Sequence, residues 1–149
     1  MQQLDMTYED TWNTRELRLS ELGITYSEFL SSEHWLDTIK KSYSRSCYNN
    51  CDFCSKPRID LHHSSYKWLM TKDELRVVYP TCRIHHKLVH DLCKEFGISV
   101  RLGTRVLRNP FNQYTMKQIQ RISPRFKSEF VDFLRPYPNC TALERLLME

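Results

Sequence analysis

Cysteine and histidine side chains are concentrated in one part of this chain, between residues 51 and 90. Cys51 and Cys54 are separated by two residues, and Cys82 and His85 repeat that spacing further along. Two thiols from one tight turn and a second pair with the same interval are the ligand pattern of a closed, tetrahedral structural zinc site. The sequence therefore predicts that these four residues bind zinc.

Two cysteines outside these pairs bear on the assignment. Cys47 lies four residues before Cys51 and could replace it if the turn is shifted, whereas Cys93 is expected to be a plain buried thiol. Neither pair has the Cys-x-x-Cys-His order of a haem attachment site. No His-x-Glu precedes the cysteines as in a zinc deaminase. Structural zinc is the interpretation that remains.

Four histidines between Cys51 and His90 are not needed for that zinc site: His62, His63, His86 and His90. The first two are adjacent, and the last two are four residues apart, which places them on one face of a helix. Neutral imidazoles hold Zn, Ni or Mn and hold Mg less readily. These histidines predict a second, functional site whose ion the sequence does not identify.

Short elements are expected to position these side chains. Residues 58–63 and 76–79 predict two antiparallel strands, the second ended by Pro80, and residues 84–96 predict a helix stopped by Gly97. Further helices are expected at residues 14–22, 32–43, 115–122, 124–134 and 141–148, with residues 97–112 as a linker.

Length and composition indicate one globular domain, with 40% apolar and 27% charged residues among 149. No apolar run approaches the roughly 20 residues of a membrane span, and no secretory signal is visible, so we expect an intracellular, cytoplasmic protein without a membrane anchor. Reduced thiols in that compartment favour metal over disulfides.

The net charge of +4 is unevenly distributed. Residues 1–95 hold 13 basic and 14 acidic side chains, whereas residues 96–149 hold 9 and 4. A basic segment suits a polyanion such as nucleic acid, although an ordinary solvated helix face explains it equally well. The candidate phosphate contacts are Arg83, Lys87, Arg101, Arg105, Arg108, Lys117, Arg121 and Arg125.

The run from Cys51 to His90 resembles the HNH endonucleases, also called ββα-metal or His-Me finger nucleases. The resemblance depends on the paired histidines, Tyr66, the stretch Val78-Tyr79-Pro80-Thr81 and the final His-x3-His. Upstream, Phe29 to Trp35 resembles the Ser-x-x-Trp segment that often precedes the zinc knuckle in members from phages and mobile elements. The resemblance covers about residues 29–92.

The resemblance implies an α+β fold with a zinc-stapled ββα-metal core at residues 29–96, between an N-terminal helical extension (1–28) and a basic helical C-terminal extension (97–149). It implies that His63 is the general base, and that His62, His86 and His90 hold one catalytic divalent ion (Mg, Mn, Ni or Zn). The implied reaction is metal-dependent hydrolysis of double-stranded DNA, by nicking or double-strand cleavage. Oligomeric state is left open.

The chain departs from the family pattern at two points. His85 stands where the family has its last zinc cysteine, and the middle polar residue is not found at Val77 or Val78, so Asp73 or Glu74 would have to replace it. The alternative is a catalytically silent zinc-finger module that binds nucleic acid. A third hypothesis is a protein-interaction adaptor whose basic segment meets an acidic partner.

Overall fold

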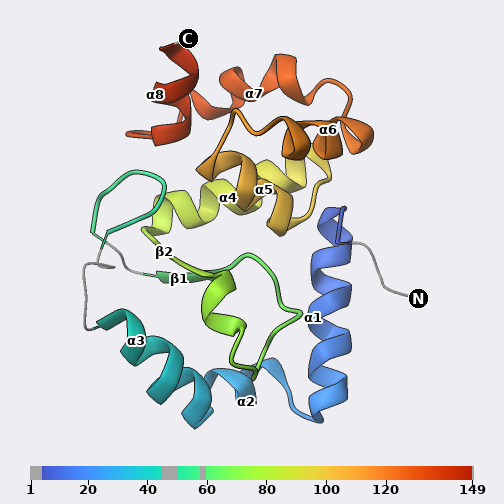
Figure 1. Ribbon diagram of the computed structural model, residues 1–149, viewed down its shortest axis with the longest axis vertical. Helices are drawn as coiled ribbons and strands as arrows, with labels where there is room; N and C mark the ends of the chain where they lie inside the picture. The colour runs from blue at the N-terminus through green and yellow to red at the C-terminus, as the bar shows by residue number, and fades with distance from the viewer. Residues whose placement is uncertain (1–4, 45–49, 58–59, 149) are drawn as a thin grey trace.

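The computed structural model describes residues 5–44, 50–57 and 60–148, which form a mainly helical fold around one two-stranded antiparallel sheet (Figure 1). This arrangement of helices and a small sheet confirms the α+β expectation at the level of fold class. Cys47, the alternative zinc ligand, and residues 58–59 at the start of the first predicted strand lie outside the described residues.

The sheet consists of β1 (Asp60–His63) and β2 (Val78–Thr81), with Asp60 opposite Thr81 and His63 opposite Val78. The second strand was predicted two residues too early, because the 3-10 turn η2 (Glu74–Val77) occupies its expected start. The prediction that Pro80 ends this strand was wrong. Both strands of a two-stranded sheet are edges, where a missing N–H is tolerated, and the Pro80 carbonyl accepts from the Asp52 N–H.

Helix α4 (Arg83–Phe96) follows β2 and confirms the predicted helix. Cys82 caps its first turn, with Sγ accepting from the His85 N–H. Gly97 ends the helix in the left-handed conformation at φ +67°, which glycine adopts without a steric penalty.

Helix α5 (Val100–Arg108) occupies the segment that was predicted to be a linker, so that prediction was wrong. Ser99 caps the helix, and Val100, Leu102, Val106 and Leu107 are buried. Gly103, a poor helix former, obscures this helix in the sequence, yet here a Cβ atom would lie 2.3 Å from the Cys93 sulfur. The glycine therefore permits a close crossing of α4 and α5.

Three further helices cover the side of α4 and α5 that is turned away from the hairpin (Figure 1): α6 (Gln113–Ile122), α7 (Phe126–Leu134) and α8 (Thr141–Leu147). Each confirms a predicted helix within about two residues at its start. The Thr141 N–H donates to the Phe53 carbonyl, which fixes the start of α8 to the segment that carries Cys51 and Cys54. These helices share one hydrophobic cluster with α4 and α5.

A second hydrophobic cluster lies on the other face of the hairpin, formed with α1 (Tyr8–Leu22), α2 (Tyr26–Leu30), η1 (His34–Ile39) and α3 (Lys40–Ser44). α1 begins six residues before its predicted start, because Thr7 and Asp10 form a capping box. The helix expected at residues 32–43 is present, but its first part is π-helical. No helix in the described ranges is long and apolar enough to cross a membrane.

Candidate metal centres and basic cleft

The first candidate metal centre joins the turn at Cys51 and Cys54 to the start of α4. The ligand atoms of Cys51, Cys54, Cys82 and His85 all lie within 4.8 Å of one another, so the predicted set converges and can hold zinc. Cys54 Sγ and Cys82 Sγ are 3.7 Å apart, close to the edge of about 3.8 Å that a tetrahedron with Zn–S bonds of about 2.3 Å requires.

Burial makes these thiols poor acids in the absence of an ion. It raises the pKa of Cys51 to about 12 and also raises the pKa of Cys54, so both would stay protonated at neutral pH. Zn²⁺ binding displaces such protons and supplies the charge that stabilises the thiolates. Burial lowers the pKa of His85, which keeps this imidazole neutral and able to bind metal. The donor set therefore fits a structural zinc ion.

The second candidate centre consists of His62 on β1 with His86 and His90 on α4, whose ligand atoms also lie within 4.8 Å of one another. The His62 ring contacts the other two with centroid separations of 5.1 and 5.7 Å. The family resemblance implied these three residues as the ligands of one ion, and the fold brings them together.

Thr104 on α5 determines the proton position on His62. The Thr104 hydroxyl donates to the Val100 carbonyl at 2.8 Å, so at 2.9 Å it can only accept from His62 Nε2–H. His62 Nδ1 is then a buried lone pair with no hydrogen-bond partner. Burial, with contributions from His86 and His90, holds the pKa of His62 well below its usual value. A neutral imidazole with one free nitrogen is what a metal ligand requires.

Two other contacts orient the histidines of α4, and one of them also fixes a proton position. Asp60 Oδ2 lies 3.2 Å from His86 Nδ1, so this carboxylate accepts from Nδ1–H and leaves Nε2 as the ligand atom. The His90 ring stacks on Trp12 of α1 with 14° between the planes. Burial, followed by the proximity of His86, lowers the pKa of His90 to about 4. Both histidines are only partly buried, so an ion held here would keep positions open to a ligand.

His63 lies on the other face of the hairpin, because successive strand residues point in opposite directions. Its ring stacks against Trp35 and Tyr66, with centroids 5.1 and 5.3 Å away, and 3% of its side chain is exposed. His63 Nε2 lies 3.0 Å from Glu74 Oε2. The structure therefore does not bring His63 into the group formed by the other three predicted histidines.

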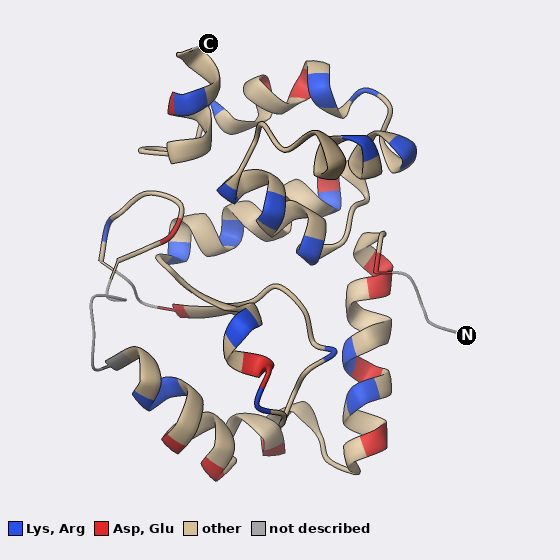
Figure 2. Cartoon of the chain, in the orientation of Figure 1, with Lys and Arg blue, Asp and Glu red and all other residues tan. Residues whose placement is uncertain are grey.

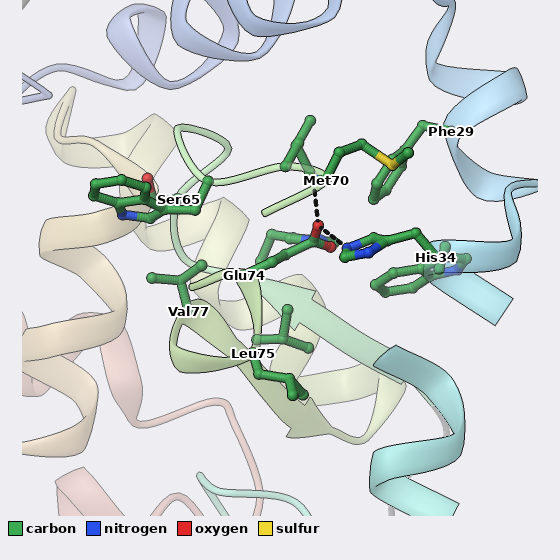
Figure 3. A network of polar contacts seen from close by, with 12 residues as sticks. Phe29, His34, Ser65, Met70, Glu74, Leu75 and Val77 are labelled. Carbon is green, nitrogen blue, oxygen red and sulfur yellow. Dashed lines mark hydrogen bonds and ion pairs between the residues drawn. The ribbon is translucent and has the colours of Figure 1, made fainter. Parts of the chain in front are cut away.

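Glu74 is a fully buried carboxylate that joins three segments (Figure 3). It accepts from His63, from His34 Nε2 at 2.9 Å and from the Met70 N–H at 2.8 Å. Burial raises the pKa of Glu74, but the hydrogen bonds from these donors outweigh burial and leave its pKa below the usual value. Of the two acidic residues that could replace the middle polar residue, Glu74 contacts His63, whereas Asp73 pairs with Arg76.

A basic cleft of about 420 Å³ lies between α5, the middle of α1 and Asp5 before it, β2, and the segments around residues 64–68 and 76–77. Its five cationic side chains are Lys67, Arg76, Arg101, Arg105 and Arg108. Figure 2 shows the basic residues spaced along α5. Thr104 also lines the cleft, so a single side chain connects it to His62.

The predicted phosphate contacts divide into two groups. Arg101, Arg105 and Arg108 line the cleft, whereas five others do not: Arg83, Lys87, Lys117, Arg121 and Arg125. In this second group Lys87 pairs with Asp91 and Arg125 with Glu129. Lys67 and Arg76 were not predicted as phosphate contacts, because each lies apart from other basic residues in the sequence and Arg76 belongs to the short 3-10 turn η2.

Other residues at the metal centres were also missed. Asp60, Thr104 and Trp12 orient the three histidines but come from three separate elements, so no local spacing connects them. Trp12 stacks on His90 and so brings α1 next to the second centre, and Arg15 lies over the rings of Trp12 and Tyr26 at 4.9 and 4.7 Å from their centroids.

No protein-family model, curated protein or solved structure matches the chain. Its function is therefore inferred from the geometry of its own residues.

Proposed function

We propose that this protein is a metal-dependent endonuclease of the HNH type, which hydrolyses DNA phosphodiester bonds with one divalent ion held by His62, His86 and His90. The observation that carries the proposal is the convergence of three imidazoles on a hairpin and the helix that follows it, with Thr104 and Asp60 fixing two of the ligand nitrogens. Such hydrogen bonds satisfy buried groups, and they also leave one nitrogen of His62 and one of His86 free for an ion.

Each group of residues has its own role in the proposed hydrolysis. A divalent ion held by the three histidines would act as a Lewis acid towards a phosphate oxygen and the leaving group. Asp60 and Thr104 orient the ligands, and the cleft arginines hold the phosphate backbone, because their guanidinium groups match phosphate oxygens in geometry and charge. The proposed zinc centre has a structural role, since Cys82 is both a ligand and the cap of the helix that carries His86 and His90.

The proposed general base is His63. Glu74 is ionised and can only accept, so His63 Nε2 carries a proton and Nδ1 is the atom that would take one from water. General-base catalysis requires contact with the attacking water. Because Trp35 and Tyr66 cover the ring in this conformation, we infer that one of them moves when DNA binds.

The second candidate function is a zinc-containing module that binds nucleic acid and does not cleave it. The burial of His63 favours this alternative, because a covered imidazole cannot reach a phosphate-bound water. Both functions use the basic cleft, and both predict zinc at the four Cys/His ligands. They differ only in the activity of the histidine group.

Relaxation of supercoiled plasmid separates the two. We expect the zinc-loaded protein to nick plasmid when Mg²⁺, Mn²⁺, Ni²⁺ or additional Zn²⁺ is supplied, and His86→Ala to lose at least about 100-fold of the rate, since it removes an ion ligand. His63→Ala should retain zinc and DNA binding and lose cleavage. Glu95→Ala, an exposed change on the same helix, is the matched control and should cleave normally.

Each outcome decides between the functions. Plasmid that is retarded in a gel but never relaxed under any of these ions establishes the binding module and rejects the nuclease. Protein that neither binds nor relaxes plasmid rejects both and leaves the adaptor hypothesis. Cleavage by His63→Ala at the wild-type rate keeps the nuclease but removes His63 as its base.

A further inference from the structure

The basic cleft continues into a second hollow along α5. The second hollow measures about 260 Å³ and is lined by Asn109, Asn112, Tyr114 and Thr115, together with Arg105 and Arg108, which also line the first. Arg101 and Arg108 are separated by about 10 Å along the helix axis, at about 1.5 Å per residue. The two hollows therefore form one surface long enough for a few linked phosphates.

The charge of this surface suits a phosphate backbone. The first hollow is lined by five cations and one acidic residue, Asp5, which is held by Arg101. Arg108 pairs with Asp52 at 3.4 Å and lies over the Tyr79 ring, 4.4 Å from its centroid. These contacts leave the guanidinium half-exposed and hold it in place, which lowers the entropy cost of binding an anion.

Each hollow also has an exposed aromatic ring. Trp68 lines the first and is 36% exposed, and Tyr114 lines the second and is 68% exposed. Neither ring belongs to a hydrophobic cluster of the described residues. Lys67 Nζ lies over the Trp68 ring at 4.9 Å, which places a cation beside the first ring. Core packing does not account for these two positions.

Exposed rings beside arginines discriminate between paired and unpaired nucleotides. Bases within a duplex are already stacked on both faces, so only an unpaired base can stack on a protein ring, with a gain of about 1–3 kcal/mol per base. A concave hollow of this size also suits a small group such as a nucleotide better than the convex side of a duplex.

We propose that the two hollows form a binding track for single-stranded nucleic acid, in which bases stack on Trp68 and Tyr114 and the intervening phosphates contact Arg105 and Arg108. The role of this track rests on the proposed function, because the bound unpaired strand or junction would then be the substrate of the nuclease. Binding itself does not require cleavage. Single strands of DNA and of RNA share the features that this track would bind, namely unpaired bases and a phosphate backbone.

Fluorescence anisotropy of labelled oligonucleotides tests the track on the full, zinc-loaded chain without other divalent ions. The probes are oligo(dT) and oligo(U) of about 12 nucleotides, within the range of single-strand site sizes, and a DNA duplex of equal length. We expect tighter binding of a single strand than of the duplex, and the two single-stranded probes show whether DNA or RNA is preferred.

Substitutions of Trp68 and Tyr114 test whether these rings contribute to single-strand binding. Trp68→Ala and Tyr114→Ala should each weaken single-strand binding by about 5- to 150-fold, the equivalent of 1–3 kcal/mol, while Trp68→Phe and Tyr114→Phe should retain most of it. Ile84→Ala, an exposed apolar change outside both hollows, should have no effect. Binding unaffected by either alanine variant, or tighter binding of the duplex, would overturn the inference.

These results are independent of the nuclease test. Single-strand binding with neither plasmid relaxation nor cleavage of the bound single strand, when divalent ions are supplied, supports the track and rejects the proposed reaction. Plasmid relaxation with a preference for duplex rejects the track and leaves the proposed reaction in place.

Discussion

Thr104 offers a sharp test of how the histidine group is prepared for an ion. Its hydroxyl accepts from His62 Nε2–H, and the His62 side chain is fully buried, so water cannot replace the acceptor when Thr104 is changed to valine. Thr104→Val keeps the shape of the side chain and leaves a buried donor unsatisfied, at a cost of about 1–3 kcal/mol.

The substitution also removes the acceptor that holds the proton of the imidazole on Nε2, so the ring is no longer fixed with Nδ1 free for the ion. Ion binding must then restore the form with the proton on Nε2. The binding free energy of the ion should weaken by up to this cost of about 1–3 kcal/mol, so its dissociation constant should rise by up to about 5- to 150-fold. This agrees with the loss of about 10- to 100-fold that is typical when a partner of a metal ligand is removed.

Calorimetric titration with Ni²⁺ of protein already loaded with zinc at the cysteine centre measures this effect. Thr104→Ser keeps the acceptor and should bind Ni²⁺ nearly as well as wild type. Thr115→Val changes a buried threonine of α6, outside the histidine group, and should bind normally. If Thr104→Val binds Ni²⁺ with the wild-type dissociation constant, the assigned tautomer of His62 is wrong.

Three further predictions concern stability. Cys82→Ala should lower the melting temperature and expose the start of α4 to hydrogen exchange, because a zinc ligand and the helix cap are lost together. Removal of zinc with a chelator should have a smaller effect in the same direction, and unchanged exchange would contradict a structural zinc. Gly103→Ala should cost about 1–3 kcal/mol in urea unfolding by overpacking against the Cys93 sulfur, and Cys93→Ala in the same chain should recover part of it. Without a second ion, the free energy of unfolding should fall as the pH drops from about 6.5 towards about 4, because the unfolded state binds a proton that His90, with its lowered pKa in the folded state, does not bind. His90→Gln should flatten that part of the profile.

The metal ligands were predictable because their spacing is local. The interval between Cys51 and Cys54, repeated by Cys82 and His85, identifies one centre, and the helical interval from His86 to His90 contributes most of the other. The helix around these residues was equally predictable, since Gly97 marks its end. Local spacing was sufficient to predict ligands wherever both members of a pair lie in the same turn or helix.

The position of His63 shows where a resemblance and strand geometry differ. The resemblance placed His62 and His63 in one site, whereas the alternation of a β-strand places them on opposite faces, and the structure follows the alternation. Residues that complete the centres were not predictable for a different reason. Thr104 lies 42 residues from His62 in sequence, and its role depends on α5, a segment that was predicted to be a linker.

Metal stoichiometry of the purified protein tests the central claim that one hairpin and its helix support two separate centres. Protein dialysed against Zn²⁺ at neutral pH should contain two ions per chain, and His86→Ala should retain one, held by the cysteine centre. A single ion in both proteins, or the loss of both ions from His86→Ala, would contradict two independent centres and with them the proposed reaction.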